Sequence, residues 1–383
     1  MNRLPEFKLE RYFGQWEFRA RHLLSPSDCE SLSVAELLEL ADDDGRQRWQ
    51  ALRLGYTESQ GDPALRKAIA AQYSAAAAAN VLVAVPEEAI FVAMQALLSP
   101  GQHVITVHPA YQSLYDVARS IGCEVSPWTI RPTGAAGGAG WRFDLDELAR
   151  MVRPTTRLLV LNFPHNPTGF LPDRATLAQI IALARRHGLI VFSDEMYRGL
   201  ELDPASRLPA AADLYENAVS LSGLSKAYGL PGLRLGWLVS RIPGFIEACL
   251  MIKDFTTICH SAPSEILGLI AVRASERLMA RNLEIIRRNA ELARASFARQ
   301  PERFQWIAPQ AGSIAFPAWT GPGSVEALCQ AALDLEGLMI VPGSIFDYPG
   351  RHFRVGLGRL NFPEALALLG RVVERAELAG NLQ

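Results

Sequence analysis

The chain has 383 residues, of which 49% are apolar, and its formal net charge is −2. This length favours two domains, or one large domain with a smaller companion, and the near-neutral charge gives no basic surface of the kind that nucleic acid or an anionic membrane would bind. The 5 cysteines are odd in number and include no CxxC pair, which argues against a disulfide framework or a zinc site, so no metal is expected.

The N-terminal segment, MNRLPEFKLERYF, contains no apolar stretch suited to a signal peptide. No apolar run in the chain approaches the length of a membrane span. We therefore expect a cytoplasmic protein whose thiols are reduced and whose partners are neither membranes nor nucleic acids.

Amphipathic stretches alternate with short apolar runs through the middle of the chain. Arg157–Asn162 is a nearly continuous apolar run, typical of a parallel strand that is buried on both faces. In chain order, the pattern predicts a helix at Asp62–Tyr73, a helix from Pro86 to about Leu98, a strand at His103–Val107, a helix from about Gln112 to Ser120, a strand at Arg157–Asn162, a helix from about Arg174 to His187, and strands at Leu189–Ser193, Ala218–Ser222 and Leu235–Val239. This alternation predicts an α/β domain with a mostly parallel sheet flanked by helices.

The pattern changes after about Pro263. A long Arg-rich amphipathic helix is expected at Ser275–Gln300, followed by short strands near Gly312–Phe316, Leu338–Val341 and Phe353–Gly356. We assign residues 46–262 to the large domain, and residues 1–45 with 263–383 to a smaller, discontinuous α+β domain. The glycine-rich stretch 133–140 is expected to be a flexible surface loop.

Lysine is scarce, and Lys226 stands in a loop of small residues, SLSGLSKAYGLPGLRLGW, directly after a predicted strand. A lysine in such a loop can form an adduct with a carbonyl group if its amine is partly neutral. Its spacing alone favours an ordinary surface lysine. Ser225 and Arg234 in the same loop would suit a phosphate dianion, although Arg234 also fits the start of the next strand.

Two further loops follow predicted strands of the same sheet. Asn166 lies in NFPHNPTGFLP, and Asp194 and Tyr197 lie in VFSDEMYRGL. Loops after the carboxyl ends of parallel strands carry the ligand site in α/β sheets. Asn166 and Asp194 are also suited to capping a helix, which remains an alternative for each. Taken with Lys226 and Arg234, however, these side chains supply the anion, donors, amine and positive charge that a pyridoxal phosphate ring needs.

The segments NFPHNPTG, SDEMYRG and SLSGLSKAYGLPGLRLGW resemble the signature segments of class I and II aminotransferases of fold type I, and the resemblance extends from about Tyr56 to Arg354. It implies a fold-type-I transferase in which residues 46–262 bind pyridoxal 5′-phosphate (PLP) as a Schiff base on Lys226, which also moves a proton. It further implies that Asp194 pairs with the ring nitrogen, and that Asn166 and Tyr197 bind the phenolic oxygen.

The resemblance implies further roles around the ring and the substrate. Tyr111 matches the aromatic residue that stacks on the ring, with a core aromatic as its alternative, while Ser225 and Arg234 would bind the phosphate. Tyr56 matches a tyrosine that reaches the phosphate of a neighbouring subunit, which implies a homodimer with shared active sites. Arg354 matches the arginine that binds the substrate α-carboxylate, and Arg351 and Arg359 are alternatives to it; Asn166 is expected to bind the substrate as well.

Three departures from the family pattern stand out. The phosphate loop reads Val85-Pro86-Glu87-Glu88, where Pro86 has no N–H, so the backbone N–H groups of Glu87 and Glu88 would bind phosphate while their carboxylates point away. Gly223 replaces a common serine. Near the N-terminus, Ser27 and Asp28 suit either the substrate pocket or a turn before a helix. Other candidates for the side-chain pocket are Trp16, Tyr12, Tyr228 and His260.

The sequence therefore predicts a PLP-dependent aminotransferase, a transferase of nitrogenous groups, that moves the α-amino group of an amino acid to a 2-oxo acid. The departures motivate an alternative, in which the same cofactor serves elimination, replacement or cyclisation of an amino acid in specialised metabolism. A third hypothesis, a PLP-binding regulator, lacks a basic DNA-binding surface in this sequence.

Overall fold

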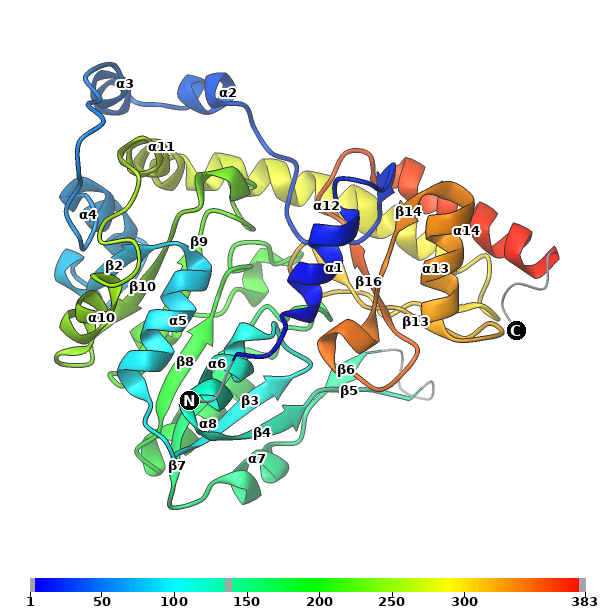
Figure 1. Ribbon diagram of the computed structural model, residues 1–383, viewed down its shortest axis with the longest axis horizontal. Coiled ribbons are helices and arrows are strands. Elements are labelled where there is room, and N and C mark those ends of the chain that lie inside the picture. Colours follow the sequence, from blue (N-terminus) through cyan, green and yellow to red (C-terminus); the bar gives the residue numbers. More distant parts are fainter. Residues whose placement is uncertain (1–3, 135–139, 379–383) are drawn as a thin grey trace.

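The computed structural model describes residues 4–134 and 140–378, and its centre is a seven-stranded sheet (Figure 1). One strand, β10, runs antiparallel to both of its neighbours, while the other pairings in this sheet are parallel. The predicted α/β class with a mostly parallel sheet is thereby confirmed. In sheet order the strands are β2 (Val81–Ala84), β10 (Gly236–Ser240), β9 (Ala218–Gly223), β8 (Ile190–Asp194), β7 (Thr156–Asn162), β3 (His103–His108) and β4 (Glu124–Thr129).

Helices cover both faces of this sheet, which explains the nearly continuous apolar runs of its strands. Along β7, Leu158 and Val160 pack into one core cluster, and Leu159 and Leu161 pack into another on the opposite face. The first cluster includes α5 (Pro86–Leu97), α6 (Ser113–Ile121) and α10 (Phe245–Lys253). The second includes α7 (Leu145–Met151), α8 (Arg174–Arg186) and α9 (Ala211–Leu214).

The carboxyl ends of β7, β8 and β9 lie at one level of the sheet. Asn162 pairs with Asp194 at the end of β7 and β8, and Asp194 pairs with Leu221 of β9. The loops that follow these strands, which contain Asn166, Tyr197 and Lys226, therefore start from one edge.

The C-terminal third packs beside this edge. The long helix α12 (Ser275–Phe297) runs from the large sheet toward the C-terminal elements (Figure 1). Helix α11 (Ala262–Arg273) precedes α12. After α12 come a small sheet of β12 (Ile314–Ala315), β16 (Phe353–Gly356) and β15 (Val341–Pro342), and a strand pair of β11 (Phe304–Gln305) and β13 (Ala318–Trp319). Helices α13 (Val325–Glu336) and α14 (Phe362–Leu378) belong to the same part of the chain.

The N-terminal segment joins the C-terminal third through a strand pair. The strand β1 (His22–Leu23) pairs in parallel with β14 (Leu338–Met339). Before it, α1 (Lys8–Trp16) lies between the large sheet and the C-terminal strands (Figure 1). After it come α2 (Val34–Glu39), α3 (Asp43–Gln50) and α4 (Pro63–Ala70), which pack against α11.

Several predicted boundaries need correction. The helix expected at Asp62–Tyr73 is shorter at both ends. It begins at Pro63, because Asp62 serves as its N-cap, and it ends at Ala70, because Ala71 is its C-cap. Strands β2 and β4 were missed, and the strand expected at Gly312–Phe316 is reduced to Ile314–Ala315. Of the predicted loop 133–140, residues 135–139 lie outside the described part of the chain. The two domain boundaries stay predictions.

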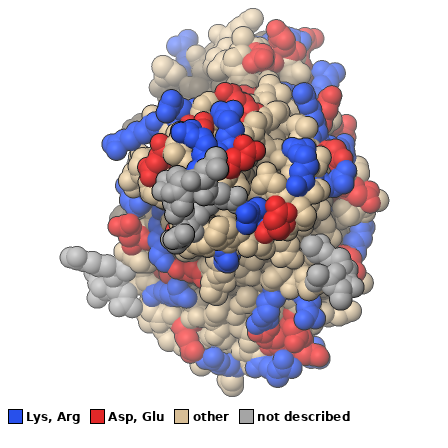
Figure 2. All heavy atoms as spheres, turned by 90° about the vertical axis from the view of Figure 1, so that its right-hand side faces the viewer, with Lys and Arg blue, Asp and Glu red and all other residues tan. Residues whose placement is uncertain are grey.

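The surface in Figure 2 carries interspersed basic and acidic side chains, with no large patch of either sign on that face. Among the helices that the structure describes, none is both long and apolar enough to cross a bilayer.

Candidate active site

A cavity of about 490 Å³ opens at the carboxyl edge of the large sheet. Its walls come from strand-end loops, the first turn of α5, helix α1 and strand β16. Nine of the predicted site residues line it, namely Glu87, Tyr111, Asn166, Asp194, Tyr197, Ser225, Lys226, Arg234 and Arg354.

Lys226 reaches this cavity from the loop after β9. Its Nζ donates a hydrogen bond to Ser27 Oγ at 2.8 Å. Burial lowers the pKa of the Lys226 amine, which increases the neutral, nucleophilic fraction of the side chain. Lys226 is therefore no freely solvated surface lysine, because it is half-buried in a cavity wall.

Asp194 and Asn166 are held together by a residue that sequence reasoning missed. The Asn162 Nδ2 group donates to the Asp194 backbone oxygen at 3.1 Å, and Asn162 Oδ1 accepts a hydrogen bond from the Asn166 N–H at 2.9 Å. Asn162 is itself buried at the end of β7. Its place as the last polar residue of a buried strand was the available signal.

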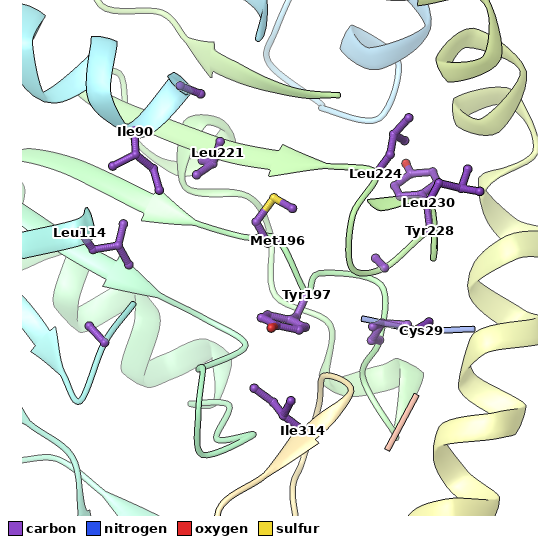
Figure 3. Packing of buried hydrophobic residues seen from close by; sticks show 14 of the residues in the cluster. Cys29, Ile90, Leu114, Met196, Tyr197, Leu221, Leu224, Tyr228, Leu230 and Ile314 are labelled. Carbon is purple, nitrogen blue, oxygen red and sulfur yellow. The ribbon is translucent and has the colours of Figure 1, made fainter. Parts of the chain in front are cut away.

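The Asp194 carboxylate is buried and accepts a hydrogen bond from the Met196 N–H at 3.1 Å. Burial raises the pKa of Asp194 to about 7. Figure 3 shows Met196 and Tyr197, which follow this strand, among buried apolar side chains from the sheet and from Ile314 of β12. A carboxylate in such surroundings strongly favours a cationic partner.

Among the residues that the structure describes, no group forms a hydrogen bond of normal geometry with two buried hydroxyl groups in the cavity wall, the phenol of Tyr197 and the Oγ of Ser225. A buried hydroxyl without a partner costs about 1–3 kcal/mol. Both groups would be satisfied by a polar ligand in the cavity. Together with the amine of Lys226 and the acid of Asp194, they fit a ring that carries an aldehyde, a phenolic oxygen and a phosphate.

Arg234 supplies positive charge at the end of the cavity near α5. Its backbone adopts φ 51°, a left-handed conformation that is uncommon for arginine and is often found at functional sites. Among the described residues it forms no ion pair, and its Nη1 donates only to the Pro231 carbonyl at 3.2 Å. The guanidinium is thus available to an anion.

The first turn of α5 faces the same end of the cavity. Backbone N–H groups in the first turn of a helix have no partner within the helix. The Glu88 carboxylate turns away and accepts a hydrogen bond from the Thr257 hydroxyl at 2.7 Å. The Glu87 carboxylate instead lines the cavity, contrary to our expectation that it points away, because Ser113 Oγ holds it there at 3.2 Å. Burial raises the pKa of Glu87 to about 7, so near neutral pH much of it is uncharged.

The departures at Pro86 and Gly223 form one packed unit. A Cβ atom added at Gly223 would lie 2.9 Å from Gly236 Cα and 3.2 Å from Pro86 Cγ. One added at Gly236 would lie 2.8 Å from Pro86 Cγ. The proline ring therefore fills space beside both glycines, and the Cβ atom of a serine at position 223 would collide with the Gly236 backbone and crowd the Pro86 ring.

Arg354 brings a buried positive charge to the other end of the cavity. It is 1% exposed, its Nε donates to the Ser25 carbonyl at 3.0 Å, and Nη1 donates to Asn166 Oδ1 at 3.4 Å. The rings of Phe13 and Phe346 pack against the guanidinium at 5.6 and 5.3 Å from their centroids. No described carboxylate pairs with it, so an anionic ligand group would complete its coordination.

Comparison with known proteins decides the family. The sequence model of the family described as "Aminotransferase class I and II" matches residues 31–365. The chain belongs to this family. The match confirms the predicted enzyme class, that of a PLP-dependent aminotransferase, and with it the cofactor.

Three individual proteins resemble this aminotransferase over nearly all of its length. Capreomycidine synthase from Streptomyces vinaceus is 31% identical over 356 residues, which cover 92% of this chain and 89% of that protein. The structure of a PLP-dependent aminotransferase from Streptococcus suis superimposes with a TM-score of 0.89 at 27% identity, covering 97% of this chain and 98% of that one. The PLP-dependent cyclase OrfR gives a TM-score of 0.88 at 29% identity, with coverages of 98% and 99%. The fold-type-I architecture is confirmed.

Two predicted site residues of the aminotransferase do not contribute side chains to the cavity within one chain. Glu88 faces Thr256 and Thr257, as described. Tyr56 is 94% exposed and lines a separate surface hollow with Leu54 and His260. Its predicted role toward a neighbouring subunit stays a prediction.

The side-chain pocket differs from the set considered from sequence. Ser27 and Asp28 line the cavity. The other candidates, Trp16, Tyr12, Tyr228 and His260, do not. Sequence reasoning missed the face of α1 that closes the cavity, formed by Glu10, Phe13 and Glu17. Their spacing of three and four residues was the available signal, because it is typical of one helix face. The spacing does not show, however, that this face lines the cavity.

Proposed function

We propose that this aminotransferase moves the α-amino group of an amino acid to a 2-oxo acid, using the cavity between the sheet edge and β16. The observation that carries the proposal is the buried guanidinium of Arg354, which has no carboxylate partner in the described chain and faces the cavity that Lys226 lines. The fork of an arginine matches both oxygens of a carboxylate. An α-amino acid bound there would present its carboxylate to Arg354 and its amino group toward Lys226.

Side chains at the strand ends would orient the cofactor. Bound PLP supplies an electron sink that stabilises negative charge at the substrate Cα. Asp194 would hold a proton on the ring nitrogen, and its carboxylate would be charged there because the cation offsets the cost of burial. Asn166 and the Tyr197 hydroxyl, which forms no hydrogen bond of normal geometry with the described residues, would donate to the phenolic oxygen.

The remaining cofactor contacts are proposed from the positions of side chains and backbone N–H groups in the cavity wall. Tyr111 would cover one face of the ring, and it is fixed by a hydrogen bond from its hydroxyl to Glu10 Oε1 at 2.7 Å. Ser225, Arg234 and the first-turn N–H groups of Glu87 and Glu88 would bind the phosphate. Lys226 would attach the cofactor covalently and then move the proton at the substrate Cα, a task that its lowered pKa favours.

We further propose a cytoplasmic homodimer with shared active sites. Leu54 and Tyr56 are 86% and 94% exposed, and Phe255 nearby is 93% exposed. Large apolar side chains on a surface are typical of an interface. In a dimer, Tyr56 would reach the phosphate of the neighbouring subunit. The free cysteines support a reducing compartment.

The test of transamination is a half-reaction. Purified holoenzyme is mixed with single amino acids in the absence of any 2-oxo acid. We expect stoichiometric release of the matching 2-oxo acid, detected by mass, and formation of pyridoxamine phosphate. Adding a second 2-oxo acid should regenerate pyridoxal phosphate. A panel of amino acids that yields no 2-oxo acid would contradict the proposal.

Cyclisation is the second candidate, and the similarity to the PLP-dependent cyclase OrfR and to capreomycidine synthase favours it. The same mixture separates the two functions. A cyclase would convert the amino acid to a product that keeps its α-nitrogen, and it would turn over without a 2-oxo acid and without accumulating pyridoxamine phosphate.

A further inference from the structure

Helix α1 presents two acids to the cavity. Glu10, Phe13 and Glu17 follow each other at helical spacing, so they lie along one face, and all three line the cavity wall. Phe13 packs on Arg354, at the proposed site of the substrate carboxylate. Glu17 lies four residues further along the helix, which corresponds to about 6 Å.

Most other charged side chains at the cavity either pair with another residue or are assigned to a substrate or cofactor group in the proposed function. Arg359, on the same side as Glu17, donates from Nε and Nη2 to the two carboxylate oxygens of Asp28 at 3.0 and 2.8 Å. Arg354 and Arg234 are assigned to the substrate carboxylate and the phosphate, and Asp194 to the ring nitrogen. Glu10 accepts the hydrogen bond of Tyr111.

Glu17 is the exception. Within residues 4–134 and 140–378 its carboxylate forms no hydrogen bond or ion pair, although the residue is half-buried in the cavity wall. Burial raises the pKa of Glu17, and the charges of Asp28 and Glu10 add to this shift, which Arg359 and Lys226 oppose. A half-buried carboxylate beside two other acids favours a cationic partner, and no described side chain forms an ion pair with it.

We propose that the amino-acid substrate carries a cationic group at the end of an extended side chain, and that Glu17 binds this group. The inference rests on the proposed function, because it places the substrate α-carboxylate on Arg354. The stem of the side chain would run along Phe13, and Glu10 would add negative potential. An acidic side chain would meet Glu17 and Glu10, while Arg359 is already bound to Asp28.

The experiment compares arginine with citrulline, which has nearly the same shape but a neutral end group. In the half-reaction with wild-type holoenzyme, we expect kcat/KM for arginine to exceed that for citrulline by roughly tenfold to a hundredfold, the range for hydrogen bonds to charged groups. Glu17→Gln should reduce this ratio toward one. Glu6→Gln is the matched control, because Glu6 precedes the same helix, is exposed and does not line the cavity, so the ratio should stay at the wild-type value.

Equilibrium binding gives a second readout that does not depend on turnover. The deaminated analogues of arginine and citrulline have no α-amino group and cannot react, so calorimetry measures their affinity for the holoenzyme directly. The cationic analogue should bind more tightly by a similar factor, and Glu17→Gln should abolish the difference. Equal affinities in the wild type would overturn the proposal, as would an unchanged preference in Glu17→Gln. If the analogues discriminate while no amino acid yields a 2-oxo acid, the proposed transamination fails and the cation site stands.

Discussion

Replacing Arg354 by lysine tests how the substrate is positioned. The lysine keeps one positive charge but loses the planar fork and the Nε–H group that donates to the Ser25 carbonyl at 3.0 Å. A carboxylate held by two charge-assisted hydrogen bonds in the wild type would keep one in the variant. The loss of one such bond costs about 1.5–3 kcal/mol. At about 1.4 kcal/mol for each factor of ten, kcat/KM should fall by roughly tenfold to 150-fold.

The assay measures kcat/KM for an amino acid and for the matching amine, which lacks the α-carboxylate. The wild type should prefer the amino acid, and Arg354→Lys should lose most of that preference because the amine makes no contact with the fork. Arg351→Lys is the matched control, since the Arg351 guanidinium donates to the carbonyls of Gly321 and Gly323 and lies outside the cavity. If Arg354→Lys lowers the rates for amine and amino acid equally, Arg354 does not bind the carboxylate and the reasoning is wrong.

Three further predictions concern the cofactor and the strand ends. After borohydride treatment and denaturation, the wild type should retain the mass of the cofactor and Lys226→Ala should not; retention in the variant would place the attachment elsewhere. Because burial raises the pKa of Asp194 to about 7, the folded state binds its proton more tightly than the unfolded state. Cofactor-free protein should therefore lose stability as the pH rises from about 4 to about 7, and thermal unfolding of Asp194→Asn should show a flatter pH dependence. Asn162→Ala removes three buried hydrogen bonds, with the Asp194 and Pro164 carbonyls and the Asn166 N–H, so the free energy of unfolding in urea should fall by about 1–3 kcal/mol; an unchanged value would show that water replaces the side chain.

Much of the fold and of the cofactor site was predictable because its signals are local. Apolar runs such as Arg157–Asn162 can be buried on both faces only in a covered parallel sheet, so the alternation of strands and helices specified the α/β class. Asp194 is the last residue of one strand of that sheet, and Asn166 and Lys226 lie in the loops that begin where two other strands end. The carboxyl ends of parallel strands lie at one edge, and these residues therefore converge without any long-range information.

The packing of residues that are distant in sequence was decided only by the tertiary structure. Pro86 and Gly223 looked like two separate losses, yet they are one contact between a proline ring and a glycine. The Glu87 carboxylate lines the cavity because Ser113, on another helix, holds it there.

At the substrate end of the site, too, the sequence determined some features and only the tertiary structure decided others. The sequence by itself determined that Lys226 and Asp194 share one edge of a sheet. It did not predict helix α1, on which Glu10 and Phe13 lie with Glu17 at its C-terminal end. Helical periodicity fixes which residues lie together, but it does not fix what the helix packs against. Helix α1 lies about two hundred residues before Lys226 in the sequence, and only the folded chain places it over the cavity that Lys226 lines. This placement makes Glu10 and Glu17 part of the cavity wall.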